Sequence, residues 1–114
     1  MGARVVDLAN AALREPSGSA VVGVLVTAAR RCAAEQARGD VRDGLIDMPL
    51  PFRAAELLEL DVDVLVDDAL ALLDGPAADC LRAFAARPDR TDARCMGWAE
   101  ETTAAGVRFT GWGA

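Results

Sequence analysis

The residues best suited to chemistry in this chain form a row of carboxylates near its middle. From Leu58 to Asp68 the sequence reads LELDVDVLVDD, in which five acids are interleaved with valine and leucine. Carboxylates that converge on one point could hold a divalent cation, and a pair of them could catalyse acid–base hydrolysis of a glycoside. The segment lacks the turn glycine and the terminal glutamate of a calcium-binding loop. Its chemistry therefore depends on the backbone that carries it.

The spacing favours a helix over a strand for this segment. Strict alternation stops after Val64, because the next two residues are both apolar and the two after those are both acidic. Winding residues 56–74 at about 100° per residue gathers the apolar side chains on one side. The opposite side collects five acids: Glu56, Glu59, Asp63, Asp67 and Asp74. We predict a break near residues 60–63, where Asp61 or Asp63 caps a second helix that runs to residue 74.

A row along a helix spreads its charges, since the backbone rises about 1.5 Å per residue. We therefore expect no metal site, no catalytic carboxylate pair and no cofactor at this row. The stretch RAAELLELDVDVLVDDALALL has the rhythm of a helix-turn-helix, but its second helix carries aspartates where a DNA-reading helix carries cations. What remains is an acidic surface, either solvated or docked against a basic partner.

Composition excludes several other classes of function. The chain has 18 acidic and 12 basic residues and a net charge of −6, which disfavours direct binding to nucleic acid or to an anionic membrane. It contains no histidine, and every basic residue is an arginine. An imidazole base, a histidine metal ligand and a lysine Schiff base are therefore all excluded.

The cysteines and aromatic residues are the remaining candidates for a site. Cys32, Cys80 and Cys95 are far apart in sequence, and we expect free thiols that pack in the core, with the least support for Cys95. Aromatic residues near the end of the chain could pack on the domain or anchor an interface. These are Trp98, Phe109 and Trp112. The arginines at 30, 31, 90 and 94 could pair with acids of a partner or remain solvated.

The elements that must position these residues are mostly helical. We predict helices over 3–15 and 20–38, the second apolar on all sides in its first half and therefore central to the core. A connector over 39–51, with a short turn of helix at 41–46, leads to a helix from Phe52. The Gly75-Pro76 pair begins another helix that Pro88 closes. A last helix is expected from about Thr91 or Asp92 to Gly106, followed by a tail that could pair as a strand, dock or stay loose.

These patterns predict an all-α fold: one compact domain of five or six short helices over residues 1–106, with a C-terminal tail over 107–114. The N-terminus does not resemble a signal peptide and no apolar run is long enough to span a membrane, so we expect a cytoplasmic protein. The favoured function is a small protein-binding module, an accessory subunit, adaptor or regulator, and self-association into a homodimer is a further expectation. One alternative is an acidic mimic of nucleic acid that inhibits a basic-groove protein. Another is a small enzyme that uses carboxylate, arginine or thiol chemistry.

Overall fold

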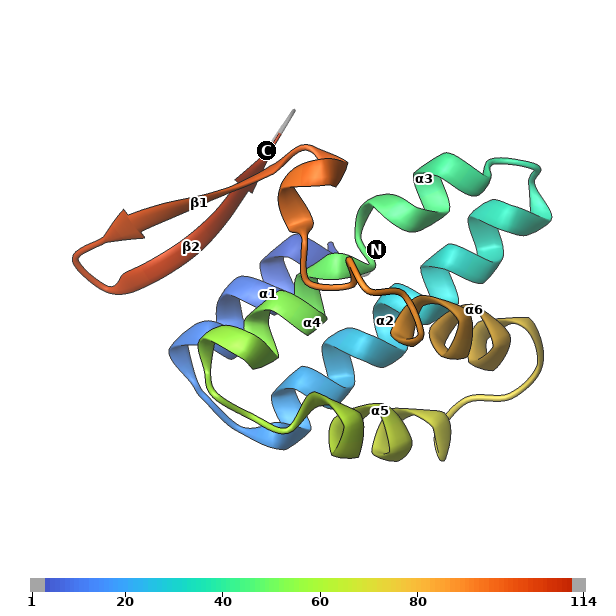
Figure 1. Ribbon diagram of the computed structural model, residues 1–114, viewed down its shortest axis with the longest axis horizontal. Helices are drawn as coiled ribbons and strands as arrows, with labels where there is room; N and C mark the ends of the chain where they lie inside the picture. Colours follow the sequence, from blue (N-terminus) through green and yellow to red (C-terminus); the bar gives the residue numbers. More distant parts are fainter. Residues whose placement is uncertain (1–3, 112–114) are drawn as a thin grey trace.

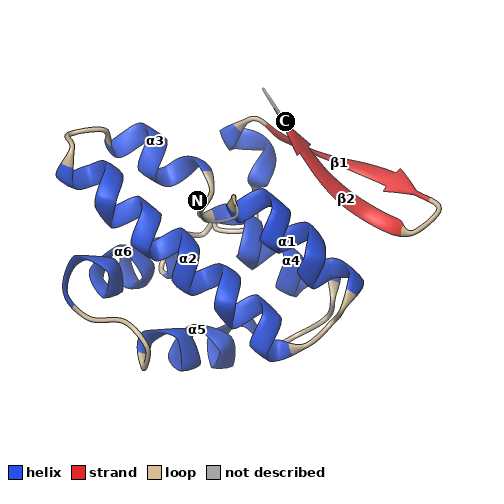
Figure 2. Cartoon of the chain, turned by 180° about the vertical axis from the view of Figure 1, so that it is seen from behind, coloured by secondary structure: helices blue, strands red, loops and turns tan. Residues whose placement is uncertain are grey.

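The computed structural model describes residues 4–111, which form a single helical body with a β-hairpin at one end (Figure 1; Figure 2). The fold is mostly α rather than purely all-α. Its α-helices are α1 (Val5–Arg14), α2 (Gly18–Ala37), α3 (Val41–Ile46), α4 (Pro49–Leu57), α5 (Val62–Leu70) and α6 (Gly75–Ala85). A 3₁₀ helix, η1 (Ala93–Met96), precedes strands β1 (Trp98–Thr103) and β2 (Gly106–Gly111).

Helix α2 is the axis of the helical body. It contacts α1, α3, α4, α5 and α6, which gather around it (Figure 2). The Ser17 hydroxyl caps its first turn by accepting a hydrogen bond from Ala20 N at 3.2 Å. Val21, Val24 and Leu25 in its first half are almost fully buried, as the apolar sequence predicts. Burial on several sides makes this helix the scaffold on which the other elements are placed.

The break between α4 and α5 lies where the sequence predicts it. Glu59 adopts the left-handed conformation, with φ of 57°, and turns the chain out of α4. Asp61 then caps α5 by accepting a hydrogen bond from Asp63 N at 3.2 Å. Helix α5 ends at Leu70, however, and not at residue 74 as predicted. After Leu70 the backbone forms hydrogen bonds between residues three apart, as in a 3₁₀ turn. Leu72 in this turn is 61% exposed.

The predicted last helix, from Thr91 or Asp92 to Gly106, is wrong. Asp92 does act as a cap, but only for the single turn of η1, which ends at Gly97 with φ of 91°. The chain then forms an antiparallel hairpin, in which Trp98 pairs with Gly111 and Thr103 with Gly106. Residues 107–111, which we expected to belong to a tail, are thus most of β2 and pair with β1.

Contacts with the helical body fix the hairpin in place. Phe109 is 1% exposed and belongs to the core. The Asn10 side chain of α1 accepts a hydrogen bond from Phe109 N at 2.7 Å and donates one to Phe109 O at 3.1 Å. Trp98 Nε1 donates to Ile46 O at 2.7 Å. These long-range contacts stabilise the hairpin. They outweigh the preference of the local sequence for a helix.

None of the helices in residues 4–111 is both long enough and apolar enough to cross a membrane.

Candidate functional site

The predicted acidic row is distributed over several elements. Glu56 lies in α4, Glu59 in the turn after it, Asp63 and Asp67 in α5, and Asp74 immediately before α6; all five are exposed. Two of these charges are partly neutralised within the chain. Glu56 pairs with Arg53, and Asp63 Oδ1 lies 2.9 Å from Arg90 Nη1. The row is therefore not one continuous acidic face.

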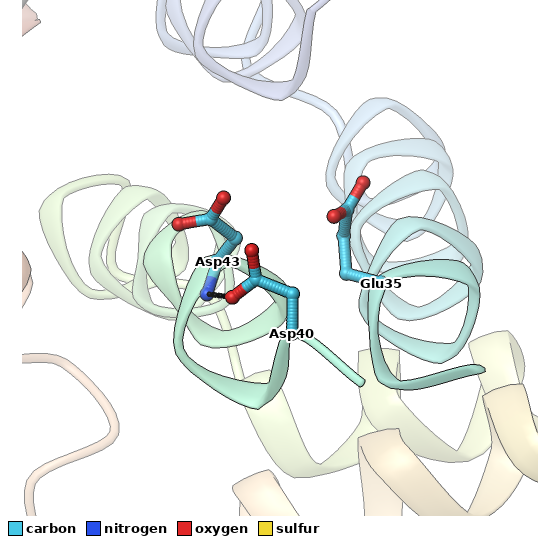
Figure 3. Close-up of side chains that lie close together, drawn as sticks. All are labelled: Glu35, Asp40 and Asp43. Atoms are coloured by element: carbon cyan, nitrogen blue, oxygen red, sulfur yellow. Dashed lines mark hydrogen bonds between the residues drawn. The ribbon is translucent and has the colours of Figure 1, made fainter. Parts of the chain in front are cut away.

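A different set of carboxylates comes together at the junction of α2 and α3 (Figure 3). Oxygens of Glu35, Asp40 and Asp43 all lie within 4.8 Å of one another. Asp40 caps α3 by accepting a hydrogen bond from Asp43 N at 3.1 Å, and Glu35 pairs with Arg38 at 3.2 Å. The hydrogen bond and negative charge of Asp40 raise the pKa of Asp43. Capping and ion pairing explain two members of this cluster, and we assign no cation to it.

The three aromatic candidates have different positions. Phe109 is enclosed in the core, so it is not an exposed contact for a partner. Trp98 is half-buried, and its indole N–H is already bonded to the backbone of Ile46. Trp112 lies outside the described residues.

The thiols are not activated for nucleophilic chemistry. Cys32 and Cys80 are buried, as predicted, and Gln36 links them by accepting from Cys80 Sγ at 3.2 Å and donating to Cys32 Sγ at 3.6 Å. Burial and the neighbouring Cys80 raise the pKa of Cys32 to about 12. Cys95, for which a core position had the least support, is instead exposed, and slight desolvation together with the negative charges of Asp92 and Asp89 raises its pKa. A thiol with a raised pKa is a poor nucleophile at neutral pH.

The sequence did not predict an open groove between α2 and α5, with a volume of about 670 Å³. Val22, Val26 and Leu65 form its apolar floor and are less than 10% exposed, while Leu72 rises at its edge. The α2 side is built from small residues one turn apart. These are Ser19, Gly23 and Thr27. The interruption of a valine-rich helix at every fourth position was a sequence signal for these small residues, but it does not show that neighbouring elements leave them uncovered.

The same small residues also line a smaller groove of about 300 Å³ between α1 and α2. Gly23 therefore lies on a ridge with an open channel on either side, and a Cβ added there would meet no atom within 4 Å. The charged side chains that line the two grooves are Asp68 and Glu15, both acids. This face of the described chain is thus apolar with acidic edges.

Comparisons of this chain with protein-family models, with curated proteins and with solved structures found no match. Inference about its function therefore rests on the geometry and charge of its surfaces.

Proposed function

We propose that this protein is a protein-binding module that holds an amphipathic helix of a partner in the groove between α2 and α5. The observation that carries the proposal is the apolar groove of about 670 Å³ with an exposed leucine, Leu72, at its rim. Leu72 extends the apolar lining of the groove to its rim, and a contiguous apolar surface of this kind is typical of an interaction site. A helix that lays its apolar face into a groove is a common mode of peptide recognition.

The ridge of small residues explains why a helix is the best-fitting occupant. Ser19, Gly23 and Thr27 recur every fourth position, so they share one side of α2. With no side chain at Gly23, the backbone of a second helix can approach α2 closely. Apolar side chains on that helix would reach the floor of the groove at Val22, Val26 and Leu65.

The charges at the edges favour a partner with basic residues beside its apolar face. Asp67 and Asp68 lie next to each other on the exposed side of α5, and within residues 4–111 neither pairs with an arginine. Glu15 lies at the far edge of the neighbouring groove. A second copy that docked by this same face would bring these acids against one another, whereas lysine or arginine would complement them.

The test uses two synthetic helical peptides with the same leucine face, one flanked by lysines and the other by glutamates. We expect fluorescence anisotropy to show binding of the lysine peptide and at least tenfold weaker binding of the glutamate peptide. Leu72→Ser and Gly23→Gln should each lower the affinity for the lysine peptide at least fivefold. Leu72→Ser removes an apolar contact, and Gly23→Gln obstructs the ridge. The matched control is Val41→Ser, which changes a similarly exposed apolar residue on α3.

Three results would contradict the proposal. The lysine peptide could fail to bind the folded protein, or Val41→Ser could weaken it as much as Leu72→Ser does. Sedimentation velocity could also show a dimer that Leu72→Ser dissociates, which would make a second copy the occupant of the groove.

A further inference from the structure

A second cavity, independent of the groove, lies where α1, α2, α3 and η1 meet, at the end of the helical body away from α5 (Figure 1). Its volume is about 620 Å³. Four arginines from four different elements line it: Arg4, Arg31, Arg42 and Arg94. The chain as a whole carries a net charge of −6, whereas this cavity concentrates positively charged guanidinium groups.

The chain itself neutralises only part of this charge. Arg31 Nε lies 3.1 Å from Asp47 Oδ2, and Arg4 pairs with the exposed Asp7 at 3.3 Å. Within residues 4–111, no carboxylate lies within 4.0 Å of the guanidinium of Arg42 or Arg94. Guanidinium groups that share a cavity repel one another, and an anion bound among them would relieve that repulsion.

The cavity also contains a buried hydrogen-bond acceptor that lacks a donor. Asp47 lines the cavity and is 6% exposed. Although Arg31 is close enough for an ion pair, its N–H is not aligned with Asp47 Oδ2, and that oxygen receives no hydrogen bond. A buried acceptor of this kind is costly unless a donor reaches it. Oδ2 is itself enclosed, so a hydroxyl on a bound molecule would supply that donor once the Asp47 carboxylate turns toward the cavity that it lines.

The remaining wall is apolar and rigid. Trp98 and Ile46 line the cavity, and the hydrogen bond from Trp98 Nε1 to Ile46 O holds the indole against the end of α3. Gly111 packs against the indole of Trp98, since a Cβ there would lie 2.5 Å from Trp98 Cε3. The indole therefore offers carbon surface rather than a free donor, which suits the carbon skeleton of a ligand.

We infer that this cavity binds a small phosphate monoester that carries a hydroxyl group. A phosphate group has oxygens pointing in several directions, so arginines from different elements can each donate to it. A carboxylate has two oxygens in one plane, and a single guanidinium can bind both of them. The phosphate would contact Arg42 and Arg94, the hydroxyl would donate to Asp47, and the carbon skeleton would lie against Trp98.

The test compares two ligands that share a three-carbon skeleton, glycerol 3-phosphate and propyl phosphate, by isothermal titration calorimetry of the full chain at low ionic strength. We expect glycerol 3-phosphate to bind more tightly, because only this ligand has hydroxyls. Arg42→Gln and Arg94→Gln should each lower the affinity for both ligands roughly tenfold, which is the usual effect of losing a charge-assisted hydrogen bond. Asp47→Leu should abolish the preference between the ligands, because leucine offers no acceptor to a hydroxyl, and it should retain binding of propyl phosphate.

Arg108→Gln is the matched control, because Arg108 is an exposed arginine on β2 that does not line the cavity. It should change either affinity less than twofold, and circular dichroism should show every variant folded. The inference is overturned if neither ligand binds the folded protein, or if Arg108→Gln weakens binding as much as Arg42→Gln does. Citrate that binds as tightly as glycerol 3-phosphate would refute the assignment to phosphate, and equal affinities for the two phosphates would refute the role of Asp47.

Discussion

At the scale of single residues, Arg53 joins the helical body to the hairpin. Its Nε and Nη2 donate to the two carboxylate oxygens of Glu100 on β1, at 2.7 and 2.9 Å, and it also pairs with Glu56 on its own helix. The side chains of Arg53 and Glu100 are only 27% and 28% exposed. A two-point arginine–carboxylate contact of this kind is stronger than an ordinary surface ion pair. It lowers the pKa of Glu100 and raises that of Arg53.

We predict that Glu100→Gln lowers the free energy of unfolding by about 1 kcal/mol at neutral pH. Because the pKa of Glu100 in the folded state lies below its ordinary value of 4.5, its stabilisation is complete above that value and is lost as the pH falls through the folded pKa. Urea unfolding of both proteins between pH 7 and pH 3 should show the difference shrinking below about pH 4.5. Glu101→Gln, on the same strand but without an ion pair in the described chain, should have little effect. A difference that does not change with pH would contradict this role of the pair.

At the scale of elements, two helical glycines lie in opposite surroundings. Gly44 of α3 packs against α2, and a Cβ there would lie 3.0 Å from Cys32 O and 3.4 Å from its Cα. The backbone of α2 cannot easily give way at such a contact. Gly23 of α2 is the opposite case, because the space around it is open. The same substitution should therefore have opposite effects at the two positions.

Gly23→Ala should raise the free energy of unfolding by roughly 0.5–1 kcal/mol, since alanine is the better helix former. Gly44→Ala should lower it by about 1–3 kcal/mol, because the added methyl forces α3 away from α2. Urea titrations of the two single variants measure both changes. Destabilisation by Gly23→Ala would show that its surroundings are not open, and a neutral Gly44→Ala would show that α3 can shift at no cost.

These elements also show what the sequence could and could not predict. Apolar periodicity located α1 and α2, and a capping aspartate located the start of α5, because each depends on residues within a few turns of one another. The hairpin depends on the contact between Asn10 and Phe109, which are 99 residues apart, and no local pattern contains it. The groove was missed for a related reason. A helical pattern shows which side of α2 is apolar, but not which part of that side its neighbours leave uncovered.

At the scale of the whole molecule, the three cysteines are divided between the interior and the surface. Cys32 and Cys80 lie in the core, whereas Cys95 is exposed on η1. The arginine cavity is likewise a property of the whole fold, since it unites residues from position 4 to position 98. Both arrangements exist only while the chain is folded.

We predict that iodoacetamide modifies Cys95 in the folded protein and modifies Cys32 and Cys80 only when the chain unfolds. Burial shields the two core thiols, and the pKa of about 12 for Cys32 leaves almost no thiolate to react. Mass spectrometry over time should show one modification first and two more at a rate that rises with urea. In a Cys95→Ser variant the first modification should be absent. Modification of Cys32 as fast as Cys95 in the absence of urea would contradict the buried position.

The contact between Asn10 and Phe109 has a consequence for how the protein is made. During synthesis α1 leaves the ribosome early. The strand that covers one side of it, β2, leaves only after nearly a hundred further residues. Until Phe109 has emerged, α1 lacks the partner that satisfies Asn10 and encloses its neighbours. A chain that stops short of this residue should therefore leave part of its interior open to chaperones and proteases. In this sense β2 closes the helical body over α1.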